Sequence, residues 1–121
     1  MKVFVIPVAG PCYEADLPET DGSCLEALHD LVGGYIEGLP IPHFVSGHEN
    51  GTAYINEDGK GQGLEVNYRA TDFMVPGIGI FYGDYIAGTM VLAGVDYSTG
   101  ENADVPEGMV RRAKLIESEA G

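Results

Sequence analysis

The sequence predicts an α+β fold, in which a mainly antiparallel β-sheet carries one capped helix from the N-terminal half of the chain and a second helix at the C-terminus. Two observations lead to this class. Short apolar runs rich in β-branched and aromatic residues are separated by glycine and proline turns, which is typical of strands. Two other segments, near residues 25–32 and 109–116, repeat apolar residues at three- and four-residue steps, which is typical of helices.

The length of 121 residues and a mean hydropathy near zero fit one ordinary domain with a core of its own. We therefore expect residues 1–121 to form a single domain, with the C-terminal helix, at about residues 106–118, at its periphery. The 18 glycines indicate many turns and close backbone approaches.

The first elements are strands followed by a helix. Residues 3–8 predict a core strand, and residues 13–16 a short second strand. The helix is expected to start in the sequence Ser-Cys-Leu-Glu at residues 23–26, which fits a capping box. Gly33 is expected to close this helix in the left-handed conformation, and Gly34 to allow a tight connection to the next apolar segment.

The second half of the chain is expected to supply the centre of the sheet. Residues 52–56 indicate a strand, residues 56–59 a turn that joins two antiparallel strands, and residues 64–71 a helical turn rather than a strand. The apolar runs 78–82 and 90–93 are expected to be central strands. Pro106 suits the first position of the last helix, which should end near Glu117.

Charge and cysteine content restrict the classes of function. The chain has 19 acidic and 6 basic residues, a formal charge of -13, which disfavours direct binding to nucleic acid and to anionic membranes. Its N-terminal apolar run is too short for a secretory or membrane-spanning segment. We therefore expect a cytoplasmic protein in which Cys12 and Cys24 are free thiols.

Three groups of residues are candidates for chemistry. His43 and His48, with the adjacent Glu49, could ligate a metal or act as acid and base, but their spacing matches no standard motif, and surface histidines are the preferred interpretation. No cofactor is indicated. The glycines around Lys60 lack the pattern of a phosphate-binding loop and predict a flexible turn.

The segment 67–71 places an amide, an aromatic ring, a guanidinium and a hydroxyl in one short polar connection. We select Lys60, Asn67, Arg69 and Thr71 as candidate ligand-binding residues, because together they could offer a positive, hydrogen-bonding region in an acidic protein. For Asn67, Arg69 and Thr71 the preferred interpretation is structural: Asn67 and Thr71 cap backbone groups and Arg69 pairs with a carboxylate. Separately, the tyrosines in the sequence Phe-Tyr-Gly-Asp-Tyr at residues 81–85 suggest a protein contact surface.

Four segments carry a resemblance to a known family: LEALHDLVGGYIE (25–37), YINEDGK (54–60), LEVNYRAT (64–71) and IAGTMVLAGVD (86–96). In their order and spacing they resemble a small family of domains of unknown function, encoded by bacteriophages and by bacteria including actinobacteria. The resemblance covers most of residues 2–106 and leaves the C-terminal helix as an addition of this chain. It implies a phage or prophage setting and transfers no catalytic residue.

These observations favour a non-enzymatic interaction protein that binds a host or phage protein, for example a component of host defence. Three alternatives stay open: a binder of a small, nucleotide-like ligand; a DNA mimic, whose carboxylates would replace phosphates on a basic partner; and a small metal-assisted hydrolase that uses His43 and His48. An exposed edge strand could also support a homodimer.

Overall fold

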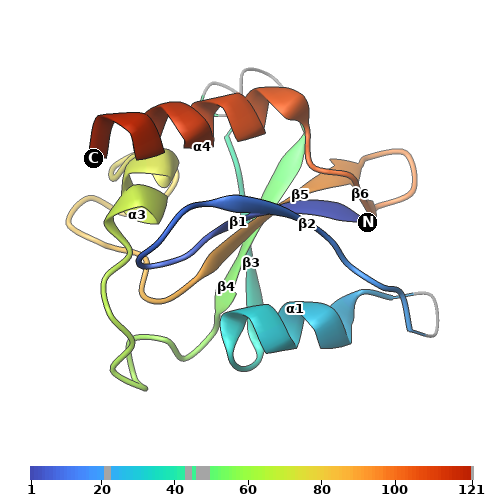
Figure 1. The fold of residues 1–121 in the computed structure, drawn as a ribbon, viewed down its shortest axis with the longest axis horizontal. Helices are drawn as coiled ribbons and strands as arrows, with labels where there is room; N and C mark the ends of the chain where they lie inside the picture. Colours follow the sequence, from blue (N-terminus) through green and yellow to red (C-terminus); the bar gives the residue numbers. More distant parts are fainter. Residues whose placement is uncertain (21–22, 43–44, 46–49, 121) are drawn as a thin grey trace.

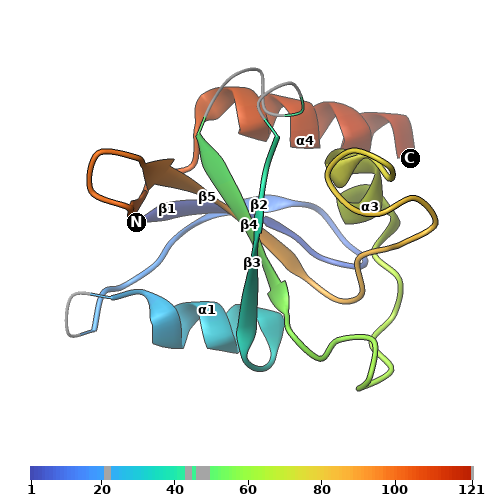
Figure 2. The same ribbon diagram turned by 180° about the vertical axis from the view of Figure 1, so that it is seen from behind.

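The computed structural model describes residues 1–20, 23–42, 45 and 50–120. His43, His48 and Glu49 lie outside this part of the chain. Within it, the fold is α+β, as the sequence predicts: an antiparallel six-stranded sheet with helices on both faces (Figures 1 and 2). No described helix has the length and apolar character needed to cross a membrane.

The sheet has the strand order β2-β1-β5-β4-β3, and β6 extends it by pairing with the far end of β5. The strands are β1 (Lys2–Ile6), β2 (Tyr13–Asp16), β3 (Ile36–Pro40), β4 (Gly51–Asn56), β5 (Met90–Asp96) and β6 (Glu101–Ala103). The helices are α1 (Leu25–Val32), α3 (Tyr68–Met74) and α4 (Glu107–Ala120). In the described part of the chain, β2 and β3 are thus the outer strands of this path.

Two apolar layers, one on each face of the sheet, explain why the sequences of β1 and β5 are continuous apolar runs. Along β1, Val3 and Val5 point to α1, whereas Phe4 and Ile6 point to α3 and α4. Side chains of a strand alternate between its faces, so a strand covered on both faces is apolar at every position. Figure 1 shows α3 and α4 on one side of the sheet and α1 on the other.

The junction between α1 and β3 explains the two consecutive glycines. Gly33 has a φ of 79°, the left-handed helix cap that the sequence predicts. A Cβ atom on Gly34 would lie 2.9 Å from Nδ2 of Asn56, a buried amide that donates a hydrogen bond to Val32 O (3.2 Å). Gly34 thus leaves room for the side chain that caps the end of α1.

Several expectations about the first half need correction. The first strand ends at Ile6, two residues early. Helix α1 begins where predicted, but the capping box is not formed: Cys24 is the N-cap, and the Ser23 hydroxyl accepts a hydrogen bond from Leu25 N. The turn after Asn56 does not join paired strands, because the chain continues through hydrogen-bonded turns to α3, and β4 pairs with β3 and β5.

The predicted strand at residues 78–82 is wrong, because these residues belong to the connection that follows α3. Val75 ends the helix with a φ of 58°, and Gly79 N donates to Met74 O (2.9 Å). A Cβ atom on Gly79 would lie 2.1 Å from that oxygen, so the glycine is needed for a turn that folds back on the helix end. The second predicted strand, β5, is central as expected.

Helix α4 runs to Ala120, three residues beyond the predicted end, and follows directly after Pro106, whose carbonyl accepts hydrogen bonds from Met109 and Val110. The side chains of Met109 and Ala113 are buried in the layer that α4 shares with α3. The C-terminal helix therefore contributes to the core of the sheet's upper face in Figure 1.

Candidate functional site

Asn67, the first of the candidate ligand-binding residues, is fully buried and holds three parts of the fold together. Its Oδ1 accepts a hydrogen bond from Ala70 N (3.0 Å) and so caps α3. Its Nδ2 donates to Ile6 O (2.8 Å) and to Gly88 O (2.9 Å), at the end of β1 and before β5. These three bonds give Asn67 a structural role.

Thr71 and Arg69 project from α3 into the same junction. The Thr71 hydroxyl donates to Asn67 O (2.8 Å) and accepts from Ile86 N (2.9 Å). The Arg69 guanidinium donates to Pro7 O (2.7 Å) and pairs with the Glu117 carboxylate of α4 (3.2 Å). The structure brings these two residues together with Asn67, and internal groups bind their polar atoms.

Glu117 also accepts a hydrogen bond from Cys12 N. Hydrogen bonding by Cys12, together with the charge of Arg69, lowers the pKa of the Glu117 carboxyl. Burial, and next the hydrogen bond to Glu117, raises the pKa of the Cys12 thiol to about 12. Cys12 and Cys24 are both free thiols, and the protonated state of Cys12 at neutral pH makes it a poor nucleophile.

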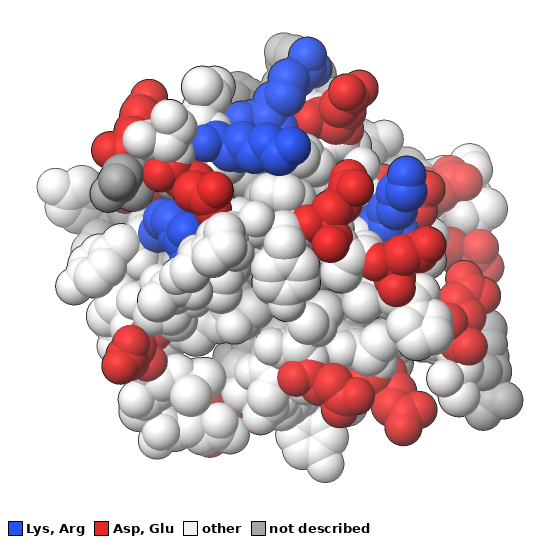
Figure 3. Space-filling view, in the orientation of Figure 1, with Lys and Arg blue, Asp and Glu red and all other residues white. Residues whose placement is uncertain are grey.

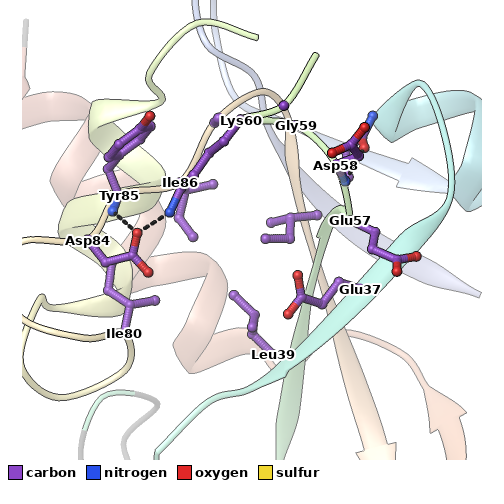
Figure 4. A pocket seen from close by; sticks show the side chains of 14 residues that line it. Glu37, Leu39, Glu57, Asp58, Gly59, Lys60, Ile80, Asp84, Tyr85 and Ile86 are labelled. Carbon is purple, nitrogen blue, oxygen red and sulfur yellow. Dashed lines mark hydrogen bonds and ion pairs between the residues drawn. The ribbon is translucent and has the colours of Figure 1, made fainter. Parts of the chain in front are cut away.

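Lys60 lies in a different place, in a cavity of about 230 Å³ between the sheet and the connections on either side of α3 (Figure 4). Its ammonium group pairs with Asp84 and sits 4.6 Å from the centre of the Tyr85 ring. The Lys60 hydrogen bond, followed by that of the Tyr85 amide, lowers the pKa of the Asp84 carboxyl. Asn67, Arg69 and Thr71 do not line this cavity.

The glycines around Lys60 form successive hydrogen-bonded turns. The amides of Gln62, Gly63 and Leu64 donate to the carbonyl oxygens of Asp58, Lys60 and Gly59 at 2.9–3.1 Å. These three N–H groups are used within the turns, so they are not available to bind a phosphate. The structure thus supports the interpretation of this segment as a turn.

A second cavity of about 530 Å³ adjoins the first one and is lined by the same two residues of β3 and by the loop that follows α3. The two share four lining residues, Glu37, Leu39, Ile80 and Asp84. We call the combined depression the β3 groove. In Figure 4 Glu37 and Leu39 extend from β3 on one side, and Ile80 and Asp84 extend from the facing loop on the other.

The loop that forms the second wall, residues 77–85, presents large apolar side chains to solvent. Phe81 is 85% exposed and Tyr82 is 91% exposed, and Ile78 is about half exposed. Gly77 and Gly83, with φ values of 93° and 83°, sit on either side of the two aromatic rings. We call the loop 77–85, with its exposed Ile78, Phe81 and Tyr82, the aromatic loop. Isolated apolar side chains on a surface are ordinary, whereas grouped exposed apolar side chains are common at protein contact sites.

The groove carries more acid than base. Glu37, Glu57, Asp58 and Asp84 line the first cavity together with Lys60, whose charge is paired with Asp84. Elsewhere, Lys and Arg atoms gather over α4 at the top of Figure 3, and Asp and Glu lie in separate groups on the face drawn. The groove is therefore a negative site with apolar walls, rather than the positive site that the sequence suggests around Lys60.

In the described part of the chain, His, Cys, Asp and Glu side chains form no group of three or more that could hold a metal ion. The two candidate histidines, His43 and His48, fall outside it. The groove itself was not predicted as a unit, because its walls come from segments far apart in the sequence. Two signals were present: Pro40 in a strand, which indicates a sheet edge, and the glycine-flanked aromatic pair Phe81 and Tyr82.

Comparisons with known proteins give one result. Neither the curated proteins nor the solved structures contain a significant match to this chain. A family described as "Domain of unknown function (DUF3846)" matches residues 1–117, so the match includes most of α4, which we expected to be an addition. The earlier resemblance to a domain of unknown function is thereby confirmed, and the chain belongs to the DUF3846 family.

Proposed function

We propose that the protein is a non-enzymatic interaction protein. It acts in the cytoplasm of a bacterial cell, in a phage or prophage setting, and binds a host or defence protein through the aromatic loop and the β3 groove. The observation that carries this proposal is the exposure of Phe81 and Tyr82, at 85% and 91%, beside the β3 groove.

Three features support this proposal over a catalytic function. The polar side chains around Asn67 serve the fold, since they bind backbone groups at strand and helix ends. The Cys12 thiol has a raised pKa, which disfavours a nucleophilic role. Aromatic residues are enriched at protein interfaces, where a few of them supply most of the binding energy.

The test is a quantitative pull-down from host lysate with immobilised protein at low and moderate salt. We compare the natural chain with the double variant Phe81→Ala, Tyr82→Ala and with the control Tyr97→Ala, which removes an exposed tyrosine from the β5–β6 turn. A partner should be retained near one-to-one stoichiometry by the natural chain and the control. The double variant should retain it at least about tenfold less, because aromatic anchors are typical hot spots.

All three proteins should have the same melting temperature within a few degrees, since the substituted side chains are exposed. Failure to recover a stoichiometric partner at either salt concentration would contradict the proposal. Equal recovery by the double variant would contradict the placement of the binding surface.

A small-ligand function is the second candidate, because Lys60 and Tyr85 line a cavity of about 230 Å³. A nucleotide-like ligand could place its base against Tyr85 and a phosphate near Lys60, although the surrounding carboxylates oppose a phosphate. Thermal shift against nucleotides and cyclic dinucleotides tests this: a ligand that binds only the folded state raises the melting temperature. An unchanged melting temperature with millimolar ligand excludes it.

A further inference from the structure

We propose that the β3 groove binds an extended, basic segment of the partner, which adds to the sheet as a new antiparallel strand beside β3. This inference rests on the proposed interaction function and specifies the chemistry of the partner. Three independent features of the groove support it: the backbone of β3, the register of its side chains, and the charge of the surrounding residues.

The backbone of β3 is available on its outer side. Glu57 N donates to Tyr35 O (2.8 Å) and Ile41 N donates to Gly51 O (3.3 Å) at the two ends of the β3–β4 ladder. Since hydrogen bonding alternates along an antiparallel strand, residues 35, 37, 39 and 41 bond to β4 and residues 36, 38 and 40 face outward. In the described part of the chain, β3 has no further strand on that side.

The residue types along β3 suit this edge position. Pro40 occupies an outward position, where its missing N–H removes no bond to β4. Ile36 and Gly38 still present both an N–H and a C=O group outward, and Pro40 presents a C=O group. An incoming strand centred on Gly38 can therefore exchange two hydrogen bonds with Gly38 and add others at each end.

The register assigns a side-chain type to each position of the incoming strand. Residues directly opposite each other in an antiparallel pair point to the same face. The side chains of the residues opposite Glu37 and Leu39 thus enter the groove. Each of these residues forms a non-hydrogen-bonded pair with its β3 neighbour, the type of pair in which side chains approach most closely. A basic residue suits the position opposite Glu37, and an apolar residue, packed on Leu39 and Ile80, suits the other.

Because the incoming strand runs antiparallel to β3, its apolar residue precedes its basic residue, with one residue between them opposite Gly38. The expected pattern is apolar–x–basic. The aromatic loop lies across the groove from Leu39, since Phe81 and Tyr82 line the second cavity with it. The loop can therefore cover the apolar residue of the partner once the strand is in place.

Charge selects a basic partner over a second copy of this chain. Four carboxylates and one paired ammonium group line the cavity, and the whole chain carries a formal charge of -13. Two copies would repel each other, and their paired β3 strands would bring Glu37 opposite Leu39 rather than opposite a base. The same field attracts a basic segment and speeds its association.

The test is selection of a random heptapeptide display library on three immobilised proteins: the natural chain, Glu37→Lys, and Glu26→Lys. The control substitution makes the same charge change on α1, which covers the opposite face of the sheet (Figure 1). The natural chain and the control should enrich apolar–x–basic peptides. The Glu37→Lys variant should bind them about tenfold more weakly and instead enrich an acidic residue at that position.

The best peptide is then synthesised with single N-methyl groups, a change that leaves the protein untouched. Methylation of the residue opposite Gly38 removes a strand hydrogen bond and should weaken binding at least about tenfold. Methylation of the basic residue, whose amide faces away from β3, should change affinity less than about twofold.

Absence of enrichment, enrichment without a charge preference, or insensitivity to both N-methyl positions would overturn this inference. So would a dimer of the natural chain in sedimentation equilibrium that Glu37→Lys dissociates, since a second copy would then occupy the edge. If a protein partner is still lost on Phe81→Ala, Tyr82→Ala while these tests fail, the proposed function stands and only the strand-addition inference falls.

Discussion

Replacement of Asn67 by alanine should destabilise the protein strongly, because one buried side chain satisfies three backbone groups. The substitution removes the cap on Ala70 N and leaves Ile6 O and Gly88 O without the Asn67 donor. Each loss amounts to about 1 kcal/mol, so the free energy of unfolding should fall by roughly 3 kcal/mol. This is a large fraction of the roughly 5–15 kcal/mol typical of a domain.

Asn67→Asp separates the two roles of the side chain. The aspartate keeps an oxygen for Ala70 N but places its second oxygen against two carbonyl oxygens. It should therefore be destabilised at least as much as the alanine variant, although it retains the helix cap. The control Asn102→Ala removes an exposed amide that accepts a hydrogen bond from the Tyr54 hydroxyl, and the free energy of unfolding should stay within about 0.5 kcal/mol of the natural chain's.

The assay is urea denaturation monitored by circular dichroism, with the slope of the transition checked for constancy across the variants. A decrease of less than about 1 kcal/mol for Asn67→Ala, at an unchanged slope, would refute the structural role. An aspartate variant as stable as the natural chain would show that the cap alone matters and that the two donated bonds do not.

Three further predictions follow from individual contacts. Gly34→Ala should lower the free energy of unfolding by roughly 1 kcal/mol, measured by the same denaturation, because its Cβ would lie 2.9 Å from Asn56 Nδ2; an unchanged midpoint would argue against that contact. Cys12 should react with iodoacetamide at pH 8 far more slowly than a free thiol, as followed by peptide mass spectrometry, since its pKa is about 12; a reaction at the rate of free cysteine would exclude this environment. The lowered pKa of Glu117 contributes stability that is present above its ordinary carboxyl pKa and is lost as pH falls through the folded-state value, so the natural chain should lose more stability than Glu117→Gln on acidification below about pH 4.5; parallel pH profiles would contradict the pairing.

The elements that sequence patterns predicted well are those governed by local chemistry or by burial on both faces. The apolar runs of β1 and β5 required two covering layers, and the structure supplies α1 on one face and α3 with α4 on the other. The left-handed cap at Gly33 could be predicted from the sequence, because few residues other than glycine adopt that conformation freely. The structural interpretation of Asn67 was among the alternatives, since asparagine before a helix is a common cap.

The parts that sequence patterns missed depend on contacts between distant segments. Residues 78–82 have strong strand propensity, but Gly79 is needed where the backbone approaches Met74 O. The pairing of Lys60 with Asp84 joins residues 24 apart. Because of it, Lys60, which was predicted to supply positive charge to a ligand-binding region, lies in the wall of an acidic groove. The outer position of β3 follows from the strand order, which no local pattern specifies.

Hydrogen–deuterium exchange of the protein, alone and with its captured partner, tests the central claim most directly. The account predicts that binding slows exchange at the outward amides of Ile36 and Gly38 and in the loop 77–85, while the amides of α1 are unchanged. Protection confined to α1, α4 or the β2 edge, with β3 and the aromatic loop exchanging as in the free protein, would contradict it.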